Sequence, residues 1–188
     1  VLNNKFYAFG GLTTAAALTT SAEVYDPALN SWSPISSLPS PGRYLHSAIS
    51  FDNYIYLLGG GDNPNDANSL SGDVWRYDPI ANNWTTITTL PTLRSGLSTV
   101  IYQGRIWVIG GAYNDVVEIY NPVSNSWETG PTLNSKRAYA SAWVANNRIY
   151  VTGGSNDGLN YLKTIETYDP VSNSWNIVGN LPEEIRSQ

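Results

Sequence analysis

The chain has 188 residues, a formal net charge of −5 and an isoelectric point of about 4.7, and 41% of its residues are hydrophobic. An acidic chain without a basic stripe is a poor partner for nucleic acid or for anionic lipid surfaces. Cysteine is absent, which excludes disulfides and thiol chemistry, and no apolar run approaches the ~18 residues of a membrane-spanning helix, so membrane insertion is not expected.

The same pattern occurs four times along the chain. Each copy has two adjacent glycines, then a Tyr-(Asp/Asn)-Pro tripeptide, and a Trp seven residues after that Tyr, with an Asn two residues before the Trp. The glycine pairs begin at Gly10, Gly59, Gly110 and Gly153. The Tyr and Trp pairs are Tyr25 and Trp32, Tyr77 and Trp84, Tyr120 and Trp127, and Tyr168 and Trp175. An arginine closes each copy, at Arg43, Arg94, Arg137 and Arg186, and each of the first three stands 16 positions before the first glycine of the next pair.

Paired glycines after a β-rich run, a Tyr one turn later, a Trp at fixed spacing and a recurring Arg resemble the kelch repeat over essentially the whole chain. The resemblance implies an all-β, kelch-type β-propeller in which each of the four repeats forms a four-stranded antiparallel blade. We expect one kelch-repeat array over residues 1–188, with the first blade incomplete at its N-terminal end. The expected blades are residues 1–42, 43–93, 94–136 and 137–188.

The expected strands follow this pattern in chain order. The first copy places strands at residues 5–9 and 22–25 and a short outer strand from Trp32, with residues 15–18 too short and too rich in Thr to form a helix alone. The strands of the second copy are expected at residues 44–51, 54–58, 73–77 and 84–87. The second strands of copies two, three and four, at residues 54–58, 105–109 and 148–151, are apolar on both faces. Such strands are buried on both sides of their sheet, as in blades stacked against each other.

The inserts between the second and third strands differ most among the copies. They are residues 61–72 in the second copy, 112–114 in the third and 155–162 in the fourth. Alternating strand direction places these inserts and the Leu-Pro…Arg connectors at one end of each sheet, and the short constant turns at the other. Variable loops on a constant scaffold mark the likelier binding face. The candidate partner-binding residues of this face are Arg43, Tyr44, Arg94, Tyr113, Asn114, Arg137, Tyr139 and Tyr161.

Two repeated charged positions are open to two interpretations. Arg43, Arg94 and Arg137 start the innermost strands, where they either stabilise the fold or face the central opening and bind a carboxylate-bearing ligand. Glu23, Glu118 and Glu166 stand two residues before the repeated Tyr, with Trp75 at this position in the second copy. A carboxylate repeated in register with the fold is better explained by a buried ion pair or a backbone hydrogen bond than by catalysis.

No catalytic residues, metal ligands or cofactors are expected. His46 is the single histidine, so neither a zinc site nor a nucleophile–base pair can be assembled. The copper radical oxidases among kelch proteins need a Cys-crosslinked Tyr and His ligands, which this chain lacks. The glycine pairs lack a phosphate-loop context, and the acidic insert around Asp62 and Asp66 lacks the Gly and closing Glu of an EF-hand.

The expected function is a non-enzymatic module that binds a protein partner, or a second copy of itself, through the variable loops. The alternative is an extracellular propeller that binds or processes carbohydrate, similar to the kelch-type sugar-acid mutarotases. Abundant Ser, Thr and Asn favour an extracellular or cell-surface location over a cytoplasmic one, and Asn83 lies in a glycosylation sequon. Because there is no Met and the first blade lacks most of one strand, we expect an excerpt of a longer array, or a strand shared head to tail between copies.

Overall fold

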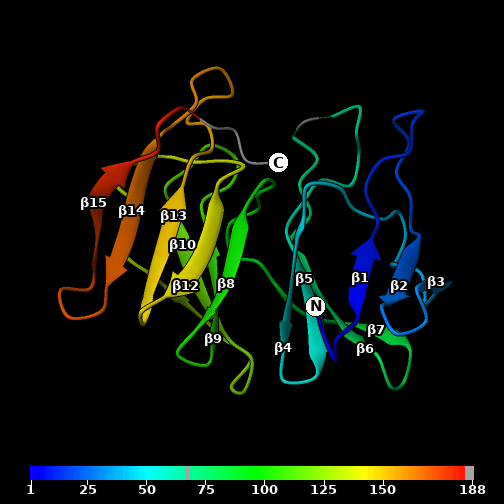
Figure 1. The fold of residues 1–188 in the computed structure, drawn as a ribbon. Helices are drawn as coiled ribbons and strands as arrows, with labels where there is room; N and C mark the ends of the chain where they lie inside the picture. The colour runs from blue at the N-terminus through cyan, green and yellow to red at the C-terminus, as the bar shows by residue number, and fades with distance from the viewer. Residues whose placement is uncertain (67, 185–188) are drawn as a thin grey trace. The chain divides into compact units, whose positions relative to one another are not determined.

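The computed structural model describes residues 1–66 and 68–184, and these form fifteen β-strands in four antiparallel sheets (Figure 1). The chain divides into two compact units, Val1–Ser95 and Gly96–Gln188, with two sheets in each. We call the sheets blades 1 to 4 in chain order. None of the described residues belongs to a helix long and apolar enough to cross a membrane.

Unit 1 holds a three-stranded and a four-stranded blade. Blade 1 consists of β1 (Phe6–Phe9), β2 (Ala22–Asp26) and β3 (Ser31–Pro34), so it lacks an innermost strand among the described residues, as expected. Blade 2 consists of β4 (Ser47–Phe51), β5 (Tyr54–Leu58), β6 (Asp73–Asp78) and β7 (Asn83–Thr89). Residues 15–18 form no helix, also as expected.

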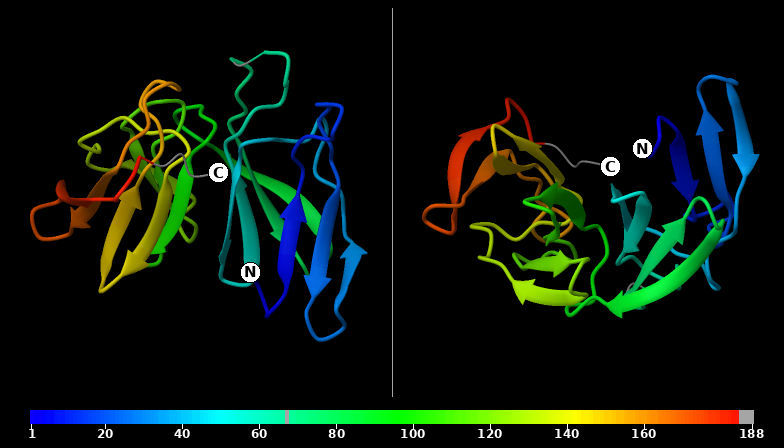
Figure 2. Two further views of the ribbon diagram at one scale, coloured as in Figure 1. Left: turned by 45° about the horizontal axis from the view of Figure 1, so that its top comes forward. Right: turned by 90° about the horizontal axis from the view of Figure 1, so that it is seen from below.

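Unit 2 holds two complete blades. Blade 3 consists of β8 (Ser98–Tyr102), β9 (Arg105–Ile109), β10 (Val117–Asn121) and β11 (Ser126–Thr129). Blade 4 consists of β12 (Ser141–Ala145), β13 (Arg148–Thr152), β14 (Thr164–Asp169) and β15 (Ser174–Asn180). In each unit the short hairpin turns lie at one end of the strands and the variable inserts at the other (Figures 1 and 2).

The repeated Tyr, Asn and Trp build the outer hairpin of each blade. Tyr and Trp are cross-strand partners in all four blades, and their ring centroids lie 5.0–5.7 Å apart. The Asn adopts a left-handed backbone, for example φ 50° at Asn173, and its Oδ1 accepts a hydrogen bond from the Tyr hydroxyl, at 2.9 Å from Tyr168. The side chain of the Asp or Asn after the Tyr accepts a hydrogen bond from the main-chain amide two residues later, which closes the turn. In blade 4, Val171 N donates to Asp169 Oδ1 at 2.9 Å.

The second strands form the centres of the two apolar cores. Leu57 on β5 and Val108 on β9 are completely buried, and the apolar character of both faces of these strands is therefore confirmed. In unit 1, Leu57 packs with Leu38 and Trp75. In unit 2, Trp107 and Ile109 of blade 3 share a cluster with Ile149 and Trp175 of blade 4. Burial of these side chains holds the two blades of each unit together.

Adjacent copies are joined by two hydrogen bonds to main-chain carbonyls. The second glycine of a pair donates to the carbonyl of the next repeated arginine, from Gly11 to Arg43 at 2.7 Å and from Gly111 to Arg137 at 2.6 Å. The repeated Trp donates its indole N–H to the preceding blade, from Trp175 Nε1 to the Pro131 carbonyl at 3.0 Å. The paired glycines are needed here because the backbone is left-handed: Gly110 has φ 60°, and a Cβ on it would lie 2.6 Å from the Arg137 carbonyl oxygen.

One strand is shorter than the sequence predicts. The innermost strand of blade 2 begins at Ser47 and not at Tyr44. Leu45 adopts a left-handed conformation with φ 53°, which interrupts the extended backbone. The same register is left-handed at Gly96 (φ 63°) and Tyr139 (φ 59°) in the next two copies.

Candidate functional site

The three repeated arginines are structural in the described chain. Arg43, Arg94 and Arg137 are at most 1% exposed, so none of them presents a guanidinium group to a ligand. Arg137 donates to the carbonyls of Gly153 (2.8 Å) and Thr164 (3.1 Å), and its Nη2 lies 2.7 Å from Glu166 Oε1. Their burial and the contacts of Arg137 favour the structural interpretation of this position over ligand binding.

The residues two positions before the repeated Tyr explain how the arginine side chains are held in the fold. Glu166 is fully buried against Arg137, and Glu118 is 5% exposed, as expected for a structural carboxylate. Trp75 replaces the Glu in blade 2, and the Arg43 guanidinium carbon lies 3.8 Å from its ring centroid. Burial lowers the pKa of Arg43 to about 10, against the opposing effects of Asp73 and Asp62, so Arg43 stays protonated at neutral pH. Glu23 in blade 1 is exposed.

Three loops of unit 2 meet around Tyr113 and Tyr139. The ring centroids of these tyrosines lie 6.1 Å apart in an edge-to-face arrangement. Tyr113 comes from the β9–β10 loop and Tyr139 from the connector before β12, and both side chains are half-buried. The third loop, residues 155–162, contributes Gly158, where a Cβ would lie 3.0 Å from the Tyr113 hydroxyl. We call this group of three loops, with residues 111–114, 138–140 and 155–162, the loop surface.

The backbone of both tyrosines is in an unfavourable region. Tyr113 has φ 55° and follows Ala112 at φ 48°, in a turn closed by the bond from Asn114 N to Gly111 O at 3.0 Å. A tight hairpin turn with two left-handed residues ordinarily contains Asn and Gly. Tyr139 has φ 59° at a register where blade 3 uses Gly96. A bulky side chain with positive φ costs free energy, about 1–2 kcal/mol, and such strain concentrates at functional sites.

Glycines missed by the sequence analysis make room for the tyrosines. A Cβ on Gly96 would lie 2.7 Å from the Tyr139 ring, and one on Gly158 would lie 3.0 Å from the Tyr113 hydroxyl. Comparison of the copies at the second position after each arginine, where Leu45, Gly96 and Tyr139 stand, would have drawn attention to the first of these glycines.

The other candidate residues lie in or near the variable loops. Asn114 shapes the loop surface: its carbonyl accepts from Arg137 N at 2.9 Å, and its Oδ1 accepts from Val116 N at 3.2 Å. Tyr161 pairs with Ser155 across the base of the third loop. Tyr44 lies in unit 1, where its main chain pairs with Gly61 and its ring covers that glycine.

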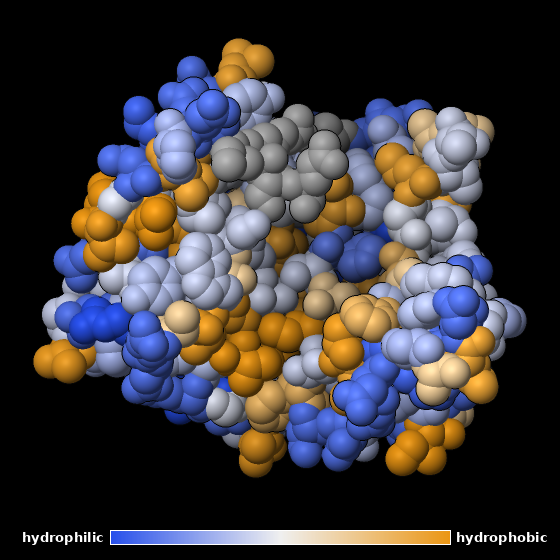
Figure 3. All heavy atoms as spheres, viewed as in Figure 1, coloured by the Kyte–Doolittle hydropathy of each residue, from blue (hydrophilic) through white to orange (hydrophobic). Residues whose placement is uncertain are grey.

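The loop surface is polar and carries few fixed charges. Figure 3 shows mostly hydrophilic residues over the loops of unit 2. Asp157 caps the tip of the third loop, and its pKa is lowered by hydrogen bonds from the amides of Asn160 and Leu159. Among the described residues, no group of three or more His, Cys, Asp or Glu side chains is placed to hold a metal ion. The arrangement is therefore suited to contact through aromatic rings, amides and hydroxyls.

Comparisons with known proteins place this fold in a family. Beta-scruin of Limulus polyphemus is 33% identical over 116 residues, which are 60% of this chain and 12% of that protein. Human Kelch-like protein 33 is 34% identical over 86 residues, covering 45% of this chain and 16% of that protein. Kelch-like ECH-associated protein 1A of Danio rerio is 31% identical over 91 residues, covering 48% of this chain and 15% of that protein. The chain thus spans less than a fifth of each of these relatives.

A solved structure supports the same fold. The structure of YjhT superposes with a TM-score of 0.82 at 17% sequence identity, covering 97% of this chain and 70% of that one. This similarity shows a shared kelch-type β-propeller fold. Residues 1–187 match the KLHDC2/KLHL20/DRC7 Kelch-repeats domain. The chain belongs to the kelch-repeat family.

Proposed function

We propose that the chain is a protein-binding module and that the loop surface of unit 2 is its main contact with a polypeptide partner. The observation that carries the proposal is the paired conformational strain at Tyr113 and Tyr139. The backbone path at position 139 does not need a tyrosine, since Leu45 and Gly96 follow the same left-handed path in blades 2 and 3. A sequence that keeps strained, half-exposed tyrosines at adjoining loops gains something other than stability from them.

The chemistry of the loop surface favours a protein partner. Tyrosine combines a large apolar ring with a hydroxyl and loses little conformational entropy on binding, which is why it is enriched at protein interfaces. The surrounding loops supply amides and hydroxyls but no cluster of basic side chains to attract phosphate. The name of one relative, Kelch-like ECH-associated protein 1A, describes an association of that protein with another, and this supports the same class of function here.

Photo-crosslinking tests the proposal directly. A photoreactive phenylalanine analogue replaces Tyr113 or Tyr139 in the full chain, and an extract of the source organism is irradiated with it. Trp143 on β12, which is 41% exposed, provides the control position. We expect positions 113 and 139 to capture the same protein and position 143 not to capture it. Capture of that protein equally well at all three positions, or at 143 alone, would contradict the proposal.

Glycine substitution then separates binding from folding. Tyr139→Gly and Tyr113→Gly remove each ring and relieve the left-handed backbone, so the free energy of unfolding should stay within about 1 kcal/mol of the parent. Affinity for the captured protein should fall by about 2 kcal/mol or more per tyrosine, as for an interface hot spot. Titration calorimetry and chemical denaturation measure the two quantities. Unchanged affinity together with a large loss of stability would show that the tyrosines serve the fold.

A further inference from the structure

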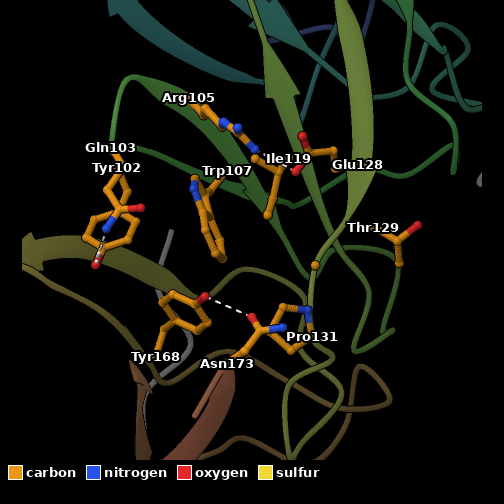
Figure 4. A pocket seen from close by; sticks show the side chains of 11 residues that line it. Tyr102, Gln103, Arg105, Trp107, Ile119, Glu128, Thr129, Pro131, Tyr168 and Asn173 are labelled. Atoms are coloured by element: carbon orange, nitrogen blue, oxygen red, sulfur yellow. Dashed lines mark hydrogen bonds and ion pairs between the residues drawn. The ribbon is translucent and has the colours of Figure 1, made fainter. Parts of the chain in front are cut away.

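A cavity of about 320 Å³ lies between blades 3 and 4, at the short-turn end of unit 2 and away from the loop surface. Figure 4 shows that polar side chains at its wall are engaged with each other. Arg105 pairs with Glu128, with Nη1 to Oε2 at 2.6 Å. The Tyr168 hydroxyl donates to Asn173 Oδ1 at 2.9 Å. Because these groups are already bonded within the protein, the features that project from unit 2 are better suited to recognition by a partner.

The third loop of the loop surface, residues 155–162, displays an apolar side chain at its tip. Leu159 is 84% exposed. Among the described residues, the only large hydrophobic side chains that are more exposed are Ile80, Val123 and Val171. These three follow the Pro of the repeated tripeptide, so their exposure belongs to the short turn that the copies share. Leu159 stands in an insert that differs from those of the other copies, and its exposure is therefore specific to blade 4.

Hydrogen bonds inside this loop hold the backbone on both sides of Leu159. Asp157 Oδ1 accepts from the amides of Leu159 at 2.9 Å and Asn160 at 2.7 Å. The Ser155 hydroxyl donates to the Asn160 carbonyl and accepts from the Gly158 amide, both at 2.8 Å. Ser155 is 1% exposed, so these bonds tie the tip to a buried base. The loop is thus pre-organised, and it loses little conformational entropy when a partner binds it.

Gly158 joins the loop tip to the tyrosine pair. It has φ 89°, and a Cβ on it would lie 3.0 Å from the Tyr113 hydroxyl oxygen, so any other residue here would press on that tyrosine. Tyr113 in turn meets Tyr139 edge to face, with ring centroids 6.1 Å apart. Leu159 is the residue next to this contact in the chain. A partner that covers the two tyrosines therefore also meets Leu159.

We propose that Leu159 is an anchor that inserts into an apolar pocket of the protein partner, held in position by Asp157. The inference rests on the proposed function, because it requires a protein that covers the loop surface. In the free chain, the isobutyl group of Leu159 is exposed to water. Its apolar area is removed from water when the partner's pocket receives it, and this burial favours the complex.

A protein pocket suits this loop better than a lipid surface. Hydrogen bonds from the amides of Asn160 and Leu159 lower the pKa of Asp157, so a carboxylate two residues before the anchor is charged at neutral pH. Residues 155–162 include no Lys or Arg that would attract anionic lipid headgroups. The same carboxylate predicts that the rim of the partner's pocket carries no acidic side chain opposite Asp157, because like charges would repel.

Variants of Leu159 test the anchor with the protein that positions 113 and 139 capture. Leu159→Asn replaces the apolar group by a polar one of similar size and should weaken binding about tenfold or more in titration calorimetry. Leu159→Met keeps an apolar side chain of similar volume and should retain most of the affinity. Val171→Asn, at a valine that is 93% exposed in a short turn of the same blade, is the matched control and should bind as the parent does.

Asp157→Ala examines how the anchor is positioned. This variant removes the acceptor of two amide bonds and leaves Leu159 in place, so binding should weaken several-fold because the loop must then be ordered by the partner. In the Leu159→Asn background the same change should have little further effect, since the loop no longer positions an anchor. Equal effects of Asp157→Ala in the two backgrounds would contradict the positioning role.

The remaining outcomes separate this inference from the proposed function. Parent-like affinity of Leu159→Asn for the captured protein would overturn the anchor and leave the tyrosine contact in place. Failure of positions 113 and 139 to capture any protein would contradict both proposals. Co-sedimentation of the full chain with vesicles of phosphatidylcholine and phosphatidylserine should show no binding that depends on Leu159. Vesicle binding by the parent chain that Leu159→Asn abolishes would overturn the protein pocket in favour of a lipid surface.

Discussion

The buried guanidinium of Arg137 is enclosed by groups of its own blade. Besides the Arg137 contact, the Glu166 carboxylate accepts hydrogen bonds from the amides of Asn134 (2.7 Å) and Ser135 (3.1 Å). The ion pair thus ties the connector between the blades to β14. A buried pair of this kind adds little net stability by its formation, but its removal from one side is costly because it leaves the other charge buried.

Replacement of Arg137 by Met should therefore be strongly destabilising. We expect Arg137→Met to lower the free energy of unfolding by about 3–5 kcal/mol, measured by urea denaturation. Arg105→Met is the matched control, because the Arg105–Glu128 pair has side chains that are 39% and 52% exposed. It should cost at most about 1 kcal/mol. Similar losses in the two variants would contradict the structural role assigned to Arg137.

His46 should make stability fall with acidification. Burial, and secondarily the charge of Arg43, lower its pKa from 6.5 to about 4. The unfolded state therefore binds a proton at His46 more readily than the folded state does. The contribution of neutral His46 to the free energy of unfolding is complete above the unfolded pKa and is lost as the pH falls from about 6.5 to about 4. The loss should reach at most about 3 kcal/mol.

His46→Leu isolates this contribution. The difference in unfolding free energy between the parent chain and His46→Leu should change between pH 7 and about pH 4.5, in the direction that favours the variant in acid. Asp26 and Asp157 also have lowered pKa values, but they act below their usual range near pH 3.8 and lie outside most of this window. A difference that is independent of pH would show that His46 does not titrate with folding.

At the scale of single residues, the sequence showed which residue types recur in the repeats, but it did not show what surrounds their side chains in the fold. The repeated position of the arginines was evident from the sequence. A guanidinium group can donate hydrogen bonds to a ligand or to main-chain carbonyls of the fold, so the sequence left both interpretations open. The copy-specific Trp107 was visible as a departure from Tyr, yet only the structure shows that its indole nitrogen has no partner. Departures from the consensus of a repeat were the most informative signal.

At the scale of elements, the outer hairpins of the blades share one geometry, but their tryptophans are buried to different extents. The repeated Trp packs on the preceding blade at Trp84 and Trp175, which donate to carbonyls of that blade. Trp32 differs, because it is 53% exposed and contacts Tyr25 of its own blade.

The cost of truncating these tryptophans should follow their burial. Trp175 is 5% exposed, and Trp175→Ala should lower the free energy of unfolding by about 3–5 kcal/mol. Trp32→Ala, which removes the same side chain from an exposed position, should cost about 1 kcal/mol or less. Thermal and urea denaturation of the two variants provide the comparison. A larger loss for Trp32→Ala would mean that Trp32 is covered in solution.

The sequence predicted strand positions well where hydrophobic patterning alone determines them. Residues 54–58 and 105–109 were predicted as strands and form β5 and β9 with the same bounds. The innermost strand of blade 2 was predicted too long, because a left-handed residue at Leu45 leaves no trace in hydrophobic patterning. The meeting of Tyr113 with Tyr139 depends on the conformation of three loops, which periodicity does not predict.

At the scale of the molecule, β1 is an edge strand of blade 1 among the described residues. In the described residues β1 is the terminal strand of its sheet and pairs with β2 alone. Edge strands present unpaired N–H and C=O groups to other strands. We therefore expect this chain to self-associate as its concentration rises, which size-exclusion chromatography with light scattering measures.

A charge on the edge strand should oppose this association. Phe6 on β1 is 49% exposed, and Phe6→Lys places a charged side chain on the open edge with little loss of core. The variant should stay monomeric at concentrations where the parent chain associates. A parent chain that is monomeric over the whole accessible range would show that the edge does not recruit a strand.

The hydrogen bonds between copies have a consequence for how such arrays change by recombination. Gly111 reaches the Arg137 carbonyl, and Trp84 and Trp175 reach the carbonyls of Ser36 and Pro131. These acceptors belong to the main chain, so every amino acid supplies them, and the Arg137 side chain donates to carbonyls of its own blade. A copy that is duplicated, deleted or moved beside a different neighbour therefore keeps these hydrogen bonds whatever residue the neighbour carries at the acceptor position. The loops can diverge without changing these bonds, so gene rearrangement can combine loops while this part of the scaffold is retained.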